Sequence, residues 1–179
     1  PTYNRTWSNV TDEFLDFTNI TLNEIDVGST LAFADTASGP TALAGADTGI
    51  SWGGFTAATY GAGSSQTLNF AYDVTSNTAG QYITSLNGVY VVDLLSGLSA
   101  DMDVVAYAYS STGSLLAVQA YGLGDPNPTP ISFFQAQSSI HVTLAVTMTI
   151  AANDTRNSVI DLSTIRQSFG TADSSQLCS

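Results

Sequence analysis

The eleven residues Ile140-His-Val-Thr-Leu-Ala-Val-Thr-Met-Thr-Ile150 decide the fold class of this chain. Every even position is apolar, whereas the odd positions from His141 to Thr149 are small or polar. Because successive side chains of a β-strand point to opposite faces, this pattern predicts a half-buried strand. At about 3.3 Å per residue it would span roughly 36 Å, enough to cross a domain. A slip of one residue would turn all the apolar side chains to the wrong face, so the pairing register should be tightly specified.

The same alternation recurs in shorter form along the chain. Residues 68–74 alternate cleanly between apolar and polar types. Residues 103–109 and 115–121 are two further apolar stretches, and they flank the turn sequence Ser-Ser-Thr-Gly-Ser at 110–114. This arrangement predicts a β-hairpin with a glycine-containing loop.

The stretch from Phe14 to Leu22 alternates imperfectly. Leu15 and Phe17 fall on one face of an extended strand, whereas Ile20 and Leu22 fall on the other. A change of phase within one strand indicates an extra residue, so we predict a β-bulge here.

These strand candidates define an all-β fold class. They are separated by Ser-, Thr- and Gly-rich turns, and no convincing amphipathic helix interrupts them. The pattern predicts a single β-sandwich or jelly-roll-like domain of about 8 to 10 mostly antiparallel strands. We place this domain at residues 14–170, with an N-terminal arm or lead-in at residues 1–13 and a C-terminal tail at residues 171–179.

Composition indicates an exported protein. The chain has 179 residues, of which only 10% are charged, and its 22 Ser and 23 Thr account for a quarter of the total. It contains no lysine, and its net charge is −12.

This charge and the lack of long apolar runs exclude two classes of partner. An acidic surface without a basic stripe repels phosphate backbones, so we expect no nucleic-acid partner. No apolar run approaches the roughly 18 residues needed to cross a bilayer, and we expect no membrane-spanning segment. Low charge with abundant Thr, Ser, Gly and Ala is typical of extracellular or cell-surface proteins.

Residues able to support catalysis are scarce. His141 is the only histidine, and Ser138 and Ser139 are near it only in sequence, which does not establish the geometry of a triad. The two glutamates, Glu13 and Glu24, lie early in the chain, where we expect them to be peripheral. We therefore predict no catalytic residues and a protein that is not an enzyme.

Binding sites have weak candidates. One histidine and one cysteine cannot fill a tetrahedral metal site, and we expect no cofactor. Asp101 and Asp103 could supply oxygen ligands to calcium, but no calcium-loop pattern surrounds them. Trp7, Trp52 and the eight tyrosines could form a sugar-stacking platform or could pack in the core. The single cysteine, Cys178, is either an inert thiol or a candidate for an intermolecular disulfide.

Four Asn-x-Thr triplets are candidate sites of N-glycosylation. A chain with ten Asn and this much Thr would contain about one such triplet by chance, so four is a modest excess. If the triplets are used, their asparagines must face solvent. The candidates are Asn4, Asn9, Asn19 and Asn153.

The C-terminal third resembles a known group of exported proteins. Val146-Thr-Met-Thr-Ile-Ala is followed by a short polar turn and then by Ser158-Val-Ile-Asp-Leu-Ser-Thr-Ile-Arg-Gln-Ser-Phe169. This pattern resembles the closing strands of exosortase-sorted (PEP-CTERM type) exported bacterial β-sandwich proteins, and the resemblance extends loosely over residues 50–170. The sequence departs from that group in lacking the sorting tail. The resemblance implies export and a surface or matrix role, and it supplies no catalytic residues.

These observations together predict an extracellular structural protein. We expect a glycosylated subunit that self-assembles into a surface layer, a matrix or a filament, with copies of itself as partners. Residues 1–13 are the candidate bridge, packing on a neighbouring subunit as an added strand. The alternative is a monomeric carbohydrate- or calcium-binding β-sandwich module.

Overall fold

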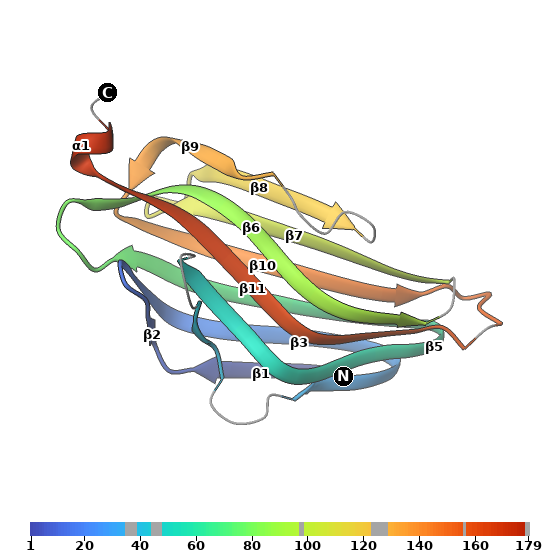
Figure 1. Ribbon diagram of the computed structural model, residues 1–179. Helices are drawn as coiled ribbons and strands as arrows, with labels where there is room; N and C mark the ends of the chain where they lie inside the picture. The colour runs from blue at the N-terminus through green and yellow to red at the C-terminus, as the bar shows by residue number, and fades with distance from the viewer. Residues whose placement is uncertain (35–38, 44–47, 97–98, 123–128, 156, 178–179) are drawn as a thin grey trace.

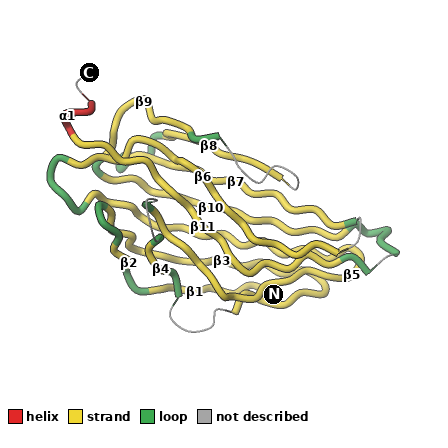
Figure 2. Tube along the Cα trace, viewed as in Figure 1, coloured by secondary structure: helices red, strands yellow, loops and turns green. Residues whose placement is uncertain are grey.

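The computed structural model describes residues 1–34, 39–43, 48–96, 99–122, 129–155 and 157–177. The described chain is nearly all β, as Figure 2 shows, and every strand pairing in it is antiparallel. Its elements are β1 (Thr2–Trp7), β2 (Val10–Thr11), β3 (Leu15–Ala34), β4 (Thr41–Ala42), β5 (Gly49–Ser76), β6 (Gln81–Ser96), β7 (Ala100–Ser110), β8 (Leu115–Gly122), β9 (Ile131–Gln137), β10 (Ser139–Ile150), β11 (Val159–Asp173) and the short helix α1 (Ser174–Leu177).

Strand β10 confirms the prediction made from its alternation. It pairs with β5 on one side and with β7 on the other over its length. Its even-numbered apolar side chains are at most 3% exposed, and they belong to the hydrophobic core. The predicted hairpin is also confirmed, because β7 and β8 pair around the 110–114 turn.

The sheet curls into a nearly closed, barrel-like shape. Its strands follow the order β8-β7-β10-β5-β11-β6-β9, with β3 and β4 also paired to β5, and β1 and β2 paired to β3. Strand β5 is long enough to pair in two parts of this sheet, since its second half pairs with β10 and its first half with β11. Figure 1 shows the first half of β5 crossing the front beside β11, with β6 on the far side of β11, while the second half of β5 returns behind them.

Glycines allow β5 to turn between these two parts of the sheet. Gly61 and Gly63 have φ values of 84° and 76°, in the left-handed region that favours glycine. Opposite them in β3, Gly28 has a φ of 78°, and the register of the β3–β5 pair shifts between Val27 and Ser29. The hairpin formed by β3 and β5 therefore bends at matched positions on both strands.

The predicted bulge in the first long strand is present. The β3–β5 register shifts between Thr18 and Thr21, and Asn19 adopts a φ of 52°. The irregularity lets residues of both phases face inward: the apolar side chains on its two sides are at most 2% exposed, namely Leu15, Phe17, Ile20 and Leu22.

Both ends of the chain extend the sheet beyond the strands that the alternation predicts. Within residues 1–13, expected to be an arm or lead-in, β1 pairs along β3 from Thr2 to Trp7 and β2 adds two further positions. The Trp7 ring lies 5.9 Å from Phe33 and 6.1 Å from Trp52, so β1 contributes to core packing of its own chain. At the other end β11 continues to Asp173, within the segment expected to be a tail. Neither difference was visible in the alternation, since both segments are short and mixed in polarity.

No helix among the described residues is both long enough and apolar enough to cross a membrane.

Candidate functional site

A row of polar side chains crosses the outer face of the sheet where β3, β5 and β10 lie side by side. The alternation that buries the even positions of β10 places His141 on the opposite, solvent-facing side. In the register of the sheet, His141 lies opposite Asp73 of β5 and opposite Tyr109 of β7. Side chains from separate strands are thereby brought side by side on one surface.

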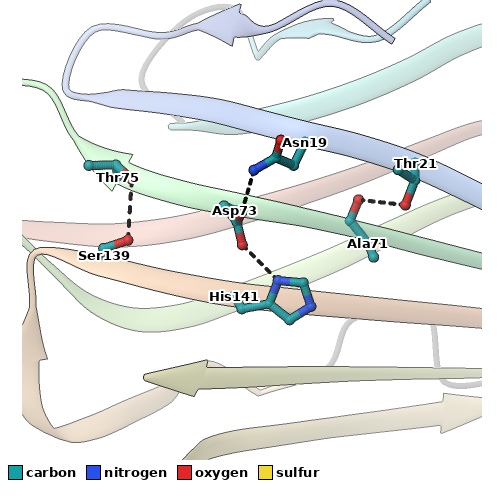
Figure 3. Close-up of polar contacts among 7 residues, drawn as sticks. All are labelled: Asn19, Thr21, Ala71, Asp73, Thr75, Ser139 and His141. Atoms are coloured by element: carbon teal, nitrogen blue, oxygen red, sulfur yellow. Dashed lines mark hydrogen bonds and ion pairs between the residues drawn. The ribbon is translucent and has the colours of Figure 1, made fainter. Parts of the chain in front are cut away.

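Asp73 is the centre of this row, as Figure 3 shows. Its Oδ1 lies 2.7 Å from Nδ1 of His141, and its Oδ2 accepts a hydrogen bond of 2.8 Å from Nδ2 of Asn19. Asn19 reaches Asp73 from the bulge in β3, where its left-handed backbone conformation is one that asparagine tolerates. We name the set Asn19, Asp73 and His141 the outer polar row.

The electrostatics of the row favour an ionised carboxylate. Partial burial by itself would raise the pKa of Asp73, but hydrogen bonds from Asn19 and His141 and the charge of His141 together lower this pKa below its usual value. The side chains of His141 and Asp73 are 46% and 35% exposed, so water screens the pair.

Aromatic rings continue the row onto β7. The ring of Tyr109 lies 6.4 Å from the His141 ring, and the Tyr107 ring lies 6.2 Å from that of Tyr109 at an angle of 16°. A polar, partly exposed surface bordered by aromatic rings is suited to binding a polar ligand through hydrogen bonds and ring contacts.

The serine beside this row has a different partner. The Ser139 hydroxyl lies 3.2 Å from the Thr75 hydroxyl, two register positions along the strands from the His141–Asp73 pair (Figure 3). A serine nucleophile needs a hydrogen bond to its base. Ser139 is instead paired with Thr75.

All four predicted glycosylation asparagines are exposed. Asn4 and Asn9 lie in or after β1, Asn19 lies in the bulge of β3, and Asn153 lies in the turn between β10 and β11. Oδ1 of Asn4 accepts a hydrogen bond from Asn23, and this bond leaves the Asn4 amide nitrogen available. The Asn19 amide nitrogen is bonded to Asp73, but a glycosylated asparagine would retain one N–H for that bond.

The remaining predicted ligands do not come together. Asp101 and Asp103 are both exposed on β7, and no group of three or more His, Cys, Asp or Glu side chains that could hold a metal occurs in the part of the chain that the structure describes. Cys178 lies outside the described residues.

Sequence reasoning missed a buried polar cluster at the bend of the β3–β5 hairpin. Glu24, expected to be peripheral, is only 1% exposed, and Asp26, Thr59 and Gln66 are 2%, 0% and 0% exposed. Burial, followed by a hydrogen bond with Asp26, raises the pKa of Glu24 to about 7. A signal for this was present in the sequence, because Glu24 and Asp26 continue the inward phase of Ile20.

A second missed residue is Gln119 of β8. It is 3% exposed, and its side-chain amide donates to the carbonyl oxygens of Leu86, Asn87 and Thr129, at 3.1, 3.3 and 2.8 Å. These bonds join β8 to the segments around β6 and β9, where the described residues show no β8–β9 backbone ladder. We call this boundary between β8 and β9 the seam.

The geometry thus defines a nearly all-β, antiparallel, barrel-like protein with a polar outer row and a buried carboxyl cluster. No family model and no curated protein match the chain. Among solved structures, the enzymatically active domain of tailspike protein 4 of bacteriophage CBA120 is similar over 84% of this chain and 19% of its own, at 10% identity and a TM-score of 0.34. A TM-score this low establishes neither a shared fold nor a shared activity.

Proposed function

We propose that this chain is a non-enzymatic, extracellular structural protein that assembles with copies of itself into a surface layer, a matrix or a filament, and that it is N-glycosylated. The lysine-free, Thr- and Ser-rich composition supports this proposal. The exposure of all four candidate asparagines and the resemblance to exosortase-sorted exported proteins support it as well.

One observation carries the proposal: Phe134 on β9 is 99% exposed. A phenylalanine buries a large apolar area when it is covered, so leaving one entirely in water is unfavourable. Leu115 and Val118 of β8, on the other side of the seam, are also exposed, at 55% and 38%. Exposed apolar side chains on both strands that border the seam favour a protein partner there.

The backbone around Phe134 supports a second copy as that partner. Strand β9 pairs with β6 at only three register positions, Ile83↔Gln137, Ser85↔Ser132 and Leu86↔Ile131. Natural sheets commonly protect such edges with lysine, and this chain has none. A second copy that packs against this edge would cover Phe134.

If residues 1–13 bridge neighbouring copies, as we propose, they must do so by exchange of β1 between copies. Strand β1 occupies the edge of its own β3, with Asp26 N–H donating to the Pro1 carbonyl at 2.9 Å. To bridge copies, β1 would have to leave this place and pair with β3 of a neighbour, as in domain swapping. Deleting residues 1–13 would also remove Trp7 from the core, so the deletion tests folding as well as assembly.

The direct test compares Phe134→Ser with Leu31→Ser. Leu31 is 55% exposed on β3, so its replacement is a matched loss of exposed apolar surface away from the seam. We expect light scattering and negative-stain microscopy to show concentration-dependent polymers for the wild type and for Leu31→Ser, but not for Phe134→Ser. A wild type that stays monomeric at high concentration, or polymers unaffected by Phe134→Ser, would contradict the proposal.

Glycosylation is tested separately. Intact mass measurement of native material should show added mass in sugar-sized steps, and each Asn→Gln variant at an occupied triplet should remove one step. A native mass equal to the sequence mass would contradict this part of the proposal.

We further propose that the fold be classed as a β-sandwich. The passage of β5 from one layer to the other, with β10 pairing in one and β11 in the other, supports this class over a round barrel. A jelly roll would be a special case of the same two-layer arrangement.

A second candidate function is a monomeric carbohydrate-binding module. The outer polar row with Tyr107 and Tyr109 favours it, because sugars are bound by aromatic rings together with carboxylate and amide groups. Tyr109→Ala should then weaken binding on a glycan array, and the sugar that binds should raise the melting temperature of the wild type.

A calcium-binding module is the other form of this alternative. Calcium should then raise the melting temperature of the wild type, and the double variant Asp101→Asn with Asp103→Asn should abolish that rise.

A further inference from the structure

The buried cluster at the bend of β5 places a nucleophile, an amide and an acid together. Thr59 and Gln66 lie on β5 on either side of the turn at residues 61–64, and both face inward with 0% exposure. Glu24 enters from β3 and is 1% exposed. These three side chains come together only because β5 folds back on itself between the two layers.

The contacts within the cluster are specific. The Thr59 hydroxyl donates to Oε1 of Gln66 at 3.4 Å, which is long for an O–H···O bond and leaves the hydroxyl loosely held. Nε2 of Gln66 donates to Oε2 of Glu24 and to the Leu31 carbonyl oxygen, both at 2.8 Å. The Gln66 amide is therefore bonded at its nitrogen to a carboxyl group and at its oxygen to the Thr59 hydroxyl.

We propose that Thr59 and Gln66 condense into an intramolecular ester with loss of ammonia. Oγ1 of Thr59 attacks Cδ of Gln66, and the hydroxyl proton passes to the amide oxygen, which gives a tetrahedral intermediate. The protonated Glu24 carboxyl then donates its proton to the nitrogen, the C–N bond breaks, and ammonia leaves. The remaining O–H proton returns to Glu24, which ends the step as it began.

The surroundings supply what this reaction needs. The nitrogen of an amide leaves only when it is protonated, and burial keeps Glu24 a proton donor near neutral pH. Fixing the two groups in one dry site replaces an encounter in solution with an intramolecular step. Ammonia released to water becomes ammonium, which draws the reaction toward the ester.

The ester would lock the bend that joins the two layers. It would close a covalent loop from Thr59 to Gln66 around the glycine turn, where the backbone is most permissive. A lysine-free chain has no side-chain amine for an amide cross-link, so an ester is the cross-link open to it. The ester would form within a single chain and does not depend on self-assembly.

Intact mass spectrometry of the folded full chain, produced in a host that adds no N-glycans, tests the ester. The wild type should be lighter than its sequence mass by about 17 Da, the mass of ammonia, and tandem spectra should place the loss in a Thr59–Gln66 cross-linked peptide. Hydroxylamine, which cleaves esters, should open the cross-link.

Matched variants separate the ester from other losses of ammonia. Thr59→Val keeps the side-chain shape but should restore the full sequence mass. Thr30→Val removes a neighbouring hydroxyl, which bonds Asp26 at 3.0 Å, and should keep the loss. A wild type at full sequence mass would overturn the proposal, as would a loss that persists in Thr59→Val or maps to succinimide at Asn87-Gly88.

Discussion

At the scale of single residues, the outer polar row depends on one asparagine in an unusual backbone conformation. The bulge at Asn19 serves two purposes, because it lets both apolar phases of β3 face the core and it turns the Asn19 amide toward Asp73. The change of hydrophobic phase, which can be read in the sequence, thus marks the residue that bonds to Asp73 on the surface. The sequence could predict the bulge, but not that Asp73 and His141, 68 residues apart, would meet beside it.

The charge state of Asp73 gives a first prediction. Since its folded pKa is lowered, its contribution to stability is present above the unfolded pKa and is lost as the pH falls through the folded pKa. His141→Ala should raise the Asp73 pKa toward its usual value, measured by the NMR titration of the side-chain carboxyl. The variant should cost less than about 1 kcal/mol of stability, because the pair is partly exposed. An unchanged titration of Asp73 would show that His141 does not stabilise the carboxylate.

The bend of the β3–β5 hairpin gives a second prediction at this scale. Gly28 has a φ of 78°, and a Cβ built on it would lie 2.5 Å from Oγ of Ser64. Gly28→Ala should therefore destabilise the fold by roughly 2 kcal/mol or more in urea unfolding, from backbone strain and crowding together.

Gly53→Ala is the matched control for Gly28→Ala. A Cβ at Gly53 would meet no atom within 4 Å, and we expect nearly unchanged stability. Equal effects of the two substitutions would mean that the bend does not require the left-handed backbone at Gly28.

At the scale of elements, the alternation of β10 was enough to predict a long half-buried strand. No comparable pattern predicted how far β5 extends. Residues 53–65 are rich in glycine and small polar residues and carry little periodicity, so they do not indicate that one strand pairs with both β10 and β11. The role of β1 was also hidden, because Trp7 finds its partners Phe33 and Trp52 only through long-range pairing. Local patterns predict strands in this chain. They do not predict which strand bends, as β5 does, or which strand covers the edge of another, as β1 covers β3.

The buried position of Glu24 makes stability depend on pH. Its pKa is raised from 4.5 to about 7 in the folded chain, first by burial, so the folded state holds this proton more tightly than the unfolded state does. The resulting stabilisation is fully present below the pKa of Glu24 in the unfolded chain, 4.5, and is lost as the pH rises through its folded pKa of about 7. Between about pH 5 and pH 8 the free energy of unfolding should fall by up to roughly 3 kcal/mol from this group.

Urea unfolding at both pH values checks this prediction with the chain's own control. Glu24→Gln should flatten the dependence, whereas Glu13→Gln, at the other and exposed glutamate, should leave it intact. A wild type that is more stable at pH 8 than at pH 5 would mean that Glu24 ionises freely in the folded chain.

The seam between β8 and β9 depends on the side chain of Gln119. Gln119→Leu would leave carbonyl groups near Leu86 and Thr129 without their donor, at a cost of about 1–3 kcal/mol. Hydrogen exchange should accelerate in β8 and β9 while the centre of β10 stays protected. Gln135→Leu, at an exposed site on β9, should leave the exchange pattern unchanged. Protection at the seam that survives Gln119→Leu would show that other contacts close it.

At the scale of the whole molecule, the net charge of −12 opposes self-assembly. The apolar contacts at the seam, which we propose hold copies together, must overcome this repulsion. Like charges on neighbouring copies repel, and salt screens this repulsion over distances beyond about 8 Å at physiological ionic strength. Near the sequence isoelectric point of about 4.1 the repulsion nearly vanishes. The exposed Phe134 would then decide whether copies join in an ordered way.

Assembly should therefore increase both with added salt at neutral pH and with acidification toward pH 4, when followed by light scattering. The two conditions remove the same repulsion by different means, and both leave Phe134 exposed at the seam. Phe134→Ser carries the same net charge as the wild type, so it should remain dispersed in salt if the apolar contact is required. If salt assembles Phe134→Ser as readily as the wild type, charge alone controls association, and the contact between copies lies elsewhere on the sheet.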